Sequence, residues 1–337
     1  MSTGSPELLY EPEPDVTEPE SASEIAARSP LQLFARRLRK DKLALVALTF
    51  VVLICLVAVF APVLTSIAGT PGPNVQNADL TTDFGQPLGP GGASTDAAGE
   101  PIKAGPFGVD DLGRDVFSRV VYGARVSLEV AFISTALIIL IGVTLGMLAG
   151  YYRGWVDTLL TRTMDVALAF PVLILAIGIG VACSGPGGCA GGLLQPGLSV
   201  VVFVIVLATW PYMARIVRGQ VLSLREKEFV EASKSLGASD LRILFREILP
   251  NLVAPIIVYG TVLIPQNILF EASLSFLGIG TPPGTPSWGA MLADAASIFR
   301  EAWWFMFFPG VALLLTVLAF NLVGDGLQDA LNPRTAK

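Results

Sequence analysis

Long apolar runs separated by polar or glycine-rich segments make up most of this chain. A helix of about 20 apolar residues spans the hydrocarbon core of a bilayer, and most of the runs approach or exceed that length. Six runs qualify as predicted spans, at residues 43–64, 127–149, 158–182, 199–217, 251–276 and 309–323. The pattern therefore predicts an all-α, polytopic membrane protein with six transmembrane helices.

Composition agrees with this prediction. Of 337 residues, 53% are hydrophobic and 15% are charged, whereas soluble domains carry about 25% charged residues. The chain contains no histidine, which excludes histidine acid–base catalysis and histidine metal ligation within this chain. No G-x-x-x-x-G-K-[ST] phosphate-binding loop occurs either, so we expect no ATP hydrolysis by the chain alone and no cofactor bound to it.

The net charge of −6 comes from the acidic first 29 residues. This segment is predicted to be a disordered cytoplasmic tail. Residues 30–42 are basic with apolar residues at helical spacing, which predicts an interfacial helix that holds the first span's N-terminal end inside. Removing the tail's seven acidic residues and one arginine from totals of 28 and 22 leaves 21 of each sign. No basic surplus therefore indicates a nucleic-acid partner.

Residues 65–126 are predicted to form an extracytoplasmic loop followed by a short surface helix. The loop is rich in glycine, proline and aspartate. Asp110, Asp111 and Asp115 allow two interpretations, a cation site or helix capping combined with an ion pair to Arg114. Capping is the favoured interpretation.

Two features inside the predicted spans indicate how the helices pack and bend. Gly142, Gly146 and Gly150 are four residues apart and share a helix face, a pattern that allows close helix approach. Pro171 is predicted to kink the third span.

Glu271 is an ionisable residue near the outer end of the fifth span. Such residues in a membrane mark functional sites by default. Glu271 is either part of the substrate path or a charge satisfied by a neighbouring helix or interfacial water, and the sequence leaves both open.

Cys183 and Cys189 enclose a short glycine-rich loop that is predicted to lie outside the membrane. An oxidising compartment allows a disulfide there, and a flexible, reduced loop is the alternative.

The segment 225–251 is polar and charged, although apolar runs flank it on both sides. Its basic residues place it in the cytoplasm by the positive-inside rule. The pattern predicts two short helices broken at Gly237, where a residue without Cβ can turn. Ala232, Ser233 and Ser235 are small enough for another molecule to pack closely.

This segment resembles the EAA loop of ABC importer permeases. The resemblance rests on Glu231-Ala232-Ser233, on Gly237 and on Ile248-Leu249-Pro250-Asn251, and the wording LSLREKEFVEASKSLGAS is most like the dipeptide, oligopeptide and nickel permeases. Pro106 to Arg125 is similarly like the family's GTDxxGRD signature, with Val109 in the threonine position. Ser233 stands in place of the usual second alanine, and Glu247 stands where the family often has histidine.

The resemblance implies a type I ABC importer permease fold. It also implies a multi-pass protein of the cytoplasmic membrane with both termini inside and a core at residues 127–324, followed by a cytoplasmic C-terminus at 325–337. The implied partners are a second homologous permease subunit, two ABC ATPases that bind ATP and Mg²⁺, membrane lipid and an extracytoplasmic solute-binding protein. The residues implied to contact the ATPase are Glu228, Glu231, Ala232, Ser233, Gly237, Ala238, Asp240 and Arg242.

The expected function is therefore that of a permease subunit moving peptides or similar small solutes by alternating access. A secondary transporter or channel that works without ATP is the competing class, and it predicts inverted repeats and charges along the spans. No clear internal repeat is visible, and charges inside the spans are few. Neither the substrate nor a role for the long loop at 65–103 can be read from the sequence.

Overall fold

The computed structural model describes residues 36 to 331 except residues 37, 83, 84, 97, 184, 186, 193 and 283. The predicted acidic tail, most of the predicted interfacial helix and residues 332–337 lie outside the described residues. The predicted cytoplasmic location of both chain ends falls there too.

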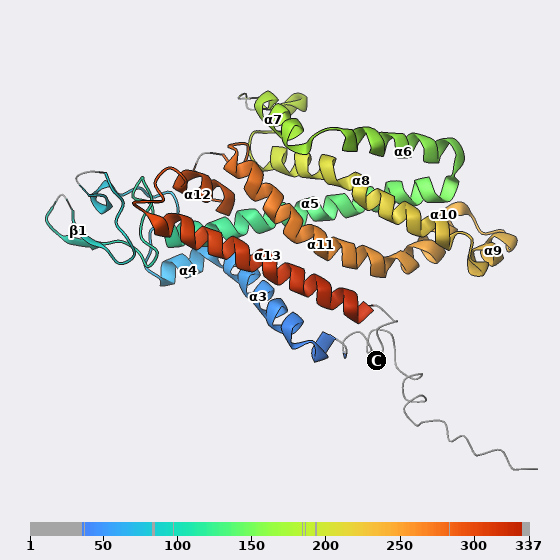
Figure 1. The fold of residues 1–337 in the computed structure, drawn as a ribbon, viewed down its shortest axis with the longest axis horizontal. Coiled ribbons are helices and arrows are strands. Elements are labelled where there is room, and N and C mark those ends of the chain that lie inside the picture. Colours follow the sequence, from blue (N-terminus) through green and yellow to red (C-terminus); the bar gives the residue numbers. More distant parts are fainter. Residues whose placement is uncertain are drawn as a thin grey trace, which may run out of the picture.

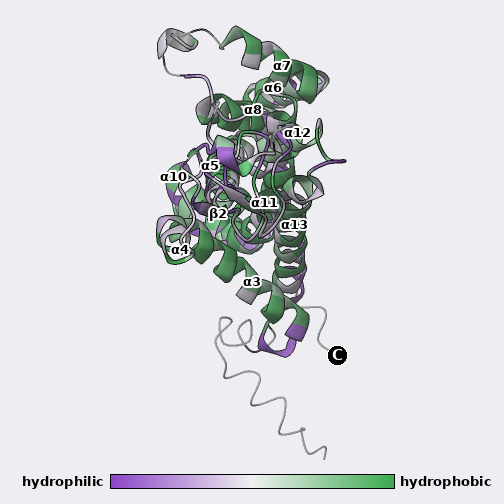
Figure 2. Cartoon of the chain, turned by 90° about the vertical axis from the view of Figure 1, so that its left-hand side faces the viewer, coloured by the Kyte–Doolittle hydropathy of each residue, from purple (hydrophilic) through white to green (hydrophobic). Residues whose placement is uncertain are grey.

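Long helices running side by side form the body of the molecule (Figure 1). Within the described residues, five helices are long and apolar enough to cross a membrane, or up to six if one bent pair counts as a single span. They are α3 (Lys42–Val59), α5 (Val116–Tyr152), α8 (Leu198–Leu224), the continuous run Asp240–Phe276 that ends in α11 (Leu249–Phe276), and α13 (Trp303–Leu331). Figure 2 shows hydrophobic residues along these helices, as lipid-facing surfaces require.

The packing of α5 against α8 is the centre of the largest core cluster. All three glycines predicted to share a face point at α8. A Cβ built on Gly146 would lie 2.6 Å from the carbonyl oxygen of Ala214, and one on Gly142 would lie 2.7 Å from the Met213 Cβ. The small-residue face is therefore confirmed, and its partner is α8.

The surface helix predicted before the second span and that span form one continuous helix, α5, which begins at Val116. The Asp115 carboxylate caps its first turn, accepting a hydrogen bond from the Ser118 amide at 2.7 Å. The Arg119 side chain is buried, with its Nε 3.4 Å from Asp110 Oδ2. The predicted surface helix is thus the N-terminal part of α5.

The third predicted span is a bent pair, α6 (Gly154–Ala169) and α7 (Val172–Ala182), whose axes differ by 83°. Phe170 is extended and Pro171 precedes the first turn of α7. The kink predicted at Pro171 is confirmed, and it is a full break of the helix.

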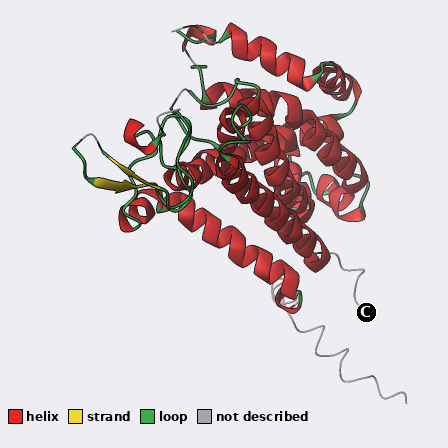
Figure 3. Ribbon diagram, turned by 60° about the vertical axis from the view of Figure 1, so that its left-hand side comes forward, coloured by secondary structure: helices red, strands yellow, loops and turns green. Residues whose placement is uncertain are grey.

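Short elements gather at one end of the molecule, opposite α9 and α10 (Figure 1). They include α4 (Ala61–Ile67), the 3-10 turn η1 (Ala78–Leu80) and α12 (Trp288–Ala295), with a second 3-10 turn η2 (Ala190–Gly192) after α7. Strands β1 (Ala93–Thr95) and β2 (Pro101–Lys103) pair antiparallel, as the hairpin in Figure 3 shows. The loop at 65–103 therefore has defined structure, and the first span ends at Val59, earlier than predicted.

Two aromatic residues near the start of α13 are buried. Trp304 and Phe305 pack with Val116 and Met291, and the Trp304 indole donates a hydrogen bond to the Val109 carbonyl at 3.0 Å. They tie α13 to the loop before α5.

Candidate functional site

The end of α9 (Glu228–Ser235) forms a glycine turn. Gly237 has φ +76°, a conformation that costs other residues free energy. The Ala238 amide donates to the Ser233 carbonyl at 3.1 Å and the Gly237 amide to the Lys234 carbonyl at 2.9 Å, the two bonds of a Schellman motif. The break predicted at Gly237 is confirmed.

The second half of the segment differs from the prediction of a short, separate helix. Helix α10 (Asp240–Arg242) leads directly into a π-helical stretch, η3 (Ile243–Ile248), and then into α11. The whole run from Asp240 to Phe276 is one 37-residue helix. π-Helices are rare and often lie at functional sites, and no sequence signal marked this one.

Apolar side chains anchor the segment to the body of the protein. Val230 of α9 and Ile243 and Ile248 of η3 are fully buried in the same cluster as Val221 of α8. The elbow formed by α9, Gly237 and α10 is therefore held firmly while its other face remains open.

Most residues predicted to contact an ATPase lie on that open face. Glu228, Glu231, Ala232, Gly237, Asp240 and Arg242 are exposed, and Ser233 and Ala238 are half-buried. The sequence reasoning missed three apolar residues beside them, Leu236 at 88% exposed, Leu241 at 65% and Phe245 at 57%. Leu241 and Phe245 are four residues apart and share a helix face. Their apolar side chains inside a charged segment are the sequence feature that could have identified them.

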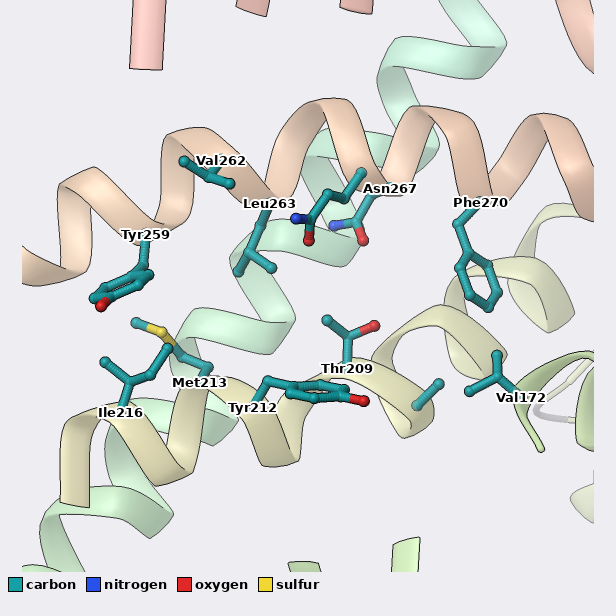
Figure 4. A pocket seen from close by; sticks show the side chains of 12 residues that line it. Val172, Thr209, Tyr212, Met213, Ile216, Tyr259, Val262, Leu263, Asn267 and Phe270 are labelled. Carbon is teal, nitrogen blue, oxygen red and sulfur yellow. The ribbon is translucent and has the colours of Figure 1, made fainter. Parts of the chain in front are cut away.

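A cavity of about 500 Å³ lies between α8 and α11, near the middle of the bundle (Figure 4). Its lining is apolar with interspersed uncharged polar side chains. The polar members are Thr209, Tyr212, Tyr259, Gln266 and Asn267. Asn267 also donates a hydrogen bond to Thr135 of α5 at 2.9 Å. Hydrogen-bonding groups without charge among apolar walls are typical of a small-molecule site.

Glu271 is fully buried and does not line this cavity. Its carboxylate accepts hydrogen bonds from Ser127 of α5 at 2.9 Å and from Ser275 at 2.7 Å. The contact with Ser127 of α5 agrees with the interpretation in which a neighbouring helix satisfies the Glu271 side chain. A place on the substrate path stays a prediction.

The two cysteines after α7 are joined in the structure, with Cα atoms 4.9 Å apart. Cys183 is buried and Cys189 half-buried. The bond closes the loop that precedes α8.

The aspartates before α5 act as caps and ion-pair partners. Asp110 Oδ2 accepts from Arg114 Nε at 2.6 Å, and Asp110 Oδ1 accepts from the Arg114 amide at 2.9 Å. Burial raises the pKa of the Asp115 carboxyl, which caps α5. The favoured interpretation, capping plus a pair with Arg114, is confirmed.

Comparison with known families decides what the chain is. The family model described as "binding-protein-dependent transport system inner membrane component" matches residues 142–337. The chain belongs to this family. A second model, the N-terminal transmembrane domain of oligopeptide transport permease C, matches residues 29–87.

Individual relatives agree over nearly the whole length. A dipeptide transport system permease protein of Alkalihalophilus pseudofirmus is 41% identical over 334 residues, which cover 99% of both chains. A glutathione transport system permease protein of Pectobacterium atrosepticum is 40% identical, over 92% of this chain and 93% of its own. An inward-facing structure of the MetNI methionine ABC transporter has the same fold, with TM-score 0.54 and 19% identity over 64% of this chain and 97% of that one.

This member of the family is a transmembrane permease subunit of an ABC importer and has the type I permease fold. The resemblance found at residues 228–251 is confirmed. The competing class of secondary transporters and channels is thereby set aside.

Proposed function

We propose that this subunit imports peptides or similar small solutes across the cytoplasmic membrane by alternating access. Relatives that are about 40% identical carry names for dipeptide, peptide and glutathione transport. The observation that carries the proposal is the elbow of α9, Gly237 and α10, which is anchored on one side and exposed on the other.

The proposed machine contains a second permease, two ATPases that bind ATP and Mg²⁺, and an extracytoplasmic solute-binding protein. Basic residues in the elbow support its cytoplasmic position. Because α12 and the β1–β2 hairpin lie at the opposite end of the bundle, that end would face outward.

The route of force follows from the continuous helix. A push on α9 reaches Gly237, whose two capping bonds resist unwinding. The run Asp240–Phe276 has no break, so displacement at its start is carried along α11 to the cavity. We propose that this movement opens and closes the cavity between α8 and α11.

The apolar residues on the elbow's open face extend the proposed ATPase contact. Leu236, Leu241 and Phe245 would be buried on docking, and full burial of one such side chain contributes about 1.5–3 kcal/mol. Glu231 and Arg242 would set the orientation through their charges.

Co-purification from cells that express the whole importer tests the coupling surface. We expect Leu241→Asp and Gly237→Val each to lower the amount of retained ATPase by about tenfold, since a loss of about 1.4 kcal/mol has that effect. Glu301→Ala is the matched control. Glu301 is exposed and lies just before α13, whose start is at the end of the bundle opposite the elbow. Normal retention of the ATPase by both elbow variants would show that the coupling surface lies elsewhere.

Uptake of a radiolabelled dipeptide into vesicles that contain the assembled importer tests the substrate class. ATP-dependent accumulation is the expected result. No accumulation of any dipeptide, with the ATPase bound, would remove peptides from the proposal.

A further inference from the structure

Besides the apolar cavity between α8 and α11, a polar cavity of about 340 Å³ lies at the end of the bundle opposite the elbow. The N-terminal turns of α5, the chain after α11 and helix α12 enclose it. Its charged lining residues are Arg114, Arg119 and Asp294.

Arg119 is buried in the wall of this cavity without a full set of partners. Its side chain is 3% exposed, and its Nε lies 3.4 Å from Asp110 Oδ2 as an ion pair but makes no hydrogen bond within the described residues. One terminal nitrogen, Nη1, donates to the Pro73 carbonyl at 3.3 Å, and Nη2 lies 3.7 Å from Asp294 Oδ2. Asp110 therefore balances the charge of Arg119, but the guanidinium N–H donors are incompletely hydrogen-bonded. A closer acceptor would be favourable there, because unfilled buried donors cost free energy.

Arg114 lies beside it and is also incompletely engaged. Its Nε is taken by Asp110, but its Nη2 lies 3.8 Å from Asp111 Oδ1 and 3.8 Å from Asp294 Oδ2. These separations exceed hydrogen-bond length. Asp111 and Asp294 are each 45% exposed, so water weakens their attraction for the arginines.

Two guanidinium groups thus face one cavity, and the nearest lining carboxylate stands just outside hydrogen-bond range of both. Guanidinium groups bind carboxylates through paired N–H donors more strongly than they bind neutral acceptors. A carboxylate oxygen about an ångström nearer to both arginines than Asp294 Oδ2 would bond to them at about 2.8 Å.

We propose that Arg114 and Arg119 form a carboxylate-binding site, for which Asp294 is a weakly held internal competitor. The outward position of the site rests on the proposed function. The carboxylate has two possible sources with one chemistry, the C-terminus of an incoming peptide or an acidic side chain of the solute-binding protein.

Direct binding to the assembled importer, without the solute-binding protein, tests the first source. The probes are Ala-Ala and its C-terminal amide. We expect the importer to bind the free acid about tenfold more tightly than the amide, and Arg119→Gln to remove this preference. Arg125→Gln, on the same helix but outside the cavity, is expected to keep it.

Docking of peptide-free solute-binding protein onto the immobilised importer tests the second source. If an acidic side chain fills the site, Arg119→Gln weakens docking about tenfold and the two probes bind equally to the wild type. Because neither measurement needs uptake, a failure of peptide transport would overturn the proposed function without deciding this test.

Asp294→Asn guards against a variant that merely fails to fold. Removing the internal competitor is expected to strengthen whichever carboxylate interaction is found, a gain that misfolding cannot produce. If Arg119→Gln changes neither the acid preference nor docking, and Asp294→Asn strengthens neither, the arginines serve only to tie α5 to α12 and the proposal is wrong.

Discussion

The hydroxyl of Tyr151 donates a hydrogen bond to Asp240 Oδ1 at 2.7 Å, joining the last turn of α5 to the first residue of α10. The same ring lies 5.6 Å from the Lys234 ammonium of α9 and 5.8 Å from the Arg225 guanidinium, within cation–π range. Arg225 also donates to the Tyr151 carbonyl. One buried aromatic residue therefore connects α5 with both helices of the elbow, α9 and α10.

Tyr151→Phe keeps the ring but removes the bond to Asp240. We expect the elbow to be loosened by about 1 kcal/mol, with the importer still assembled and its basal ATP hydrolysis retained. Stimulation of ATP hydrolysis by loaded solute-binding protein, measured in nanodiscs, is expected to fall several-fold. Tyr152→Phe, on the adjacent exposed ring, is the control, and equal stimulation in both variants would remove Tyr151 from the coupling route.

The closest approach between α5 and α8 gives a second prediction. A methyl group on Gly146 would meet backbone at 2.6 Å, and backbone cannot move aside cheaply. Gly146→Ala is expected to destabilise the protein by about 1–3 kcal/mol. Thermal unfolding in detergent measures the change.

Gly219→Ala on α8 is the matched control, because a methyl group there meets nothing within 4 Å. It is expected to be neutral or to stabilise the helix by about 0.5–1 kcal/mol. Equal melting of the two variants would show that α5 and α8 are less tightly packed than described.

Local rules predicted much of this fold. The glycine face of α5, the break at Gly237 and the break at Pro171 each follow from how one residue type limits the backbone or the approach of a neighbour. The match of Glu231, Gly237 and Pro250 to a known motif supplied the family, which no physical rule could have named.

Features that depend on tertiary partners were not predictable. The burial of Arg119 depends on Asp110, whose Oδ2 lies 3.4 Å from the Arg119 Nε. The burial of Trp304 depends on a partner outside its own helix, since its indole donates a hydrogen bond to the Val109 carbonyl. The cavity at Gln266 needs α8 and α11 side by side, and that pairing leaves no local trace in the sequence.

Two substitutions of Glu271 distinguish a structural role for its carboxylate from a role on the substrate path. Leucine would leave the Ser127 and Ser275 hydroxyls without their acceptor, at a cost of about 1–3 kcal/mol for each group. Glutamine keeps the shape and can still bond to both hydroxyls. We expect Glu271→Leu to lower the unfolding temperature and Glu271→Gln to leave both stability and the KM for dipeptide unchanged. A raised KM in Glu271→Gln would instead place this carboxylate on the substrate path.

The cysteine pair predicts a redox-dependent loop. We expect the peptide containing Cys183 and Cys189 to gain the mass of two hydrogen atoms on reduction, and both thiols to resist alkylation until then. Cys55, the free cysteine of the described residues, serves as the internal reference. Alkylation of both thiols without reductant would show that the loop is reduced in the native protein.

The cavity between α8 and α11 allows the substrate path itself to be tested. Gln266 of α11 lines this cavity and is exposed, so its amide is accessible to a solute. Gln266→Leu removes that amide at similar volume, and losing one hydrogen bond of about 0.5–1.5 kcal/mol should raise the KM for dipeptide about two- to tenfold.

Thr261→Val is the control, since Thr261 bonds to its own helix at Val258 and lies outside the cavity. Because the solute-binding protein also affects KM, uptake is compared at a saturating concentration of that protein. An unchanged KM in Gln266→Leu, with Thr261→Val equally unaffected, would mean that the solute crosses along another surface of the bundle.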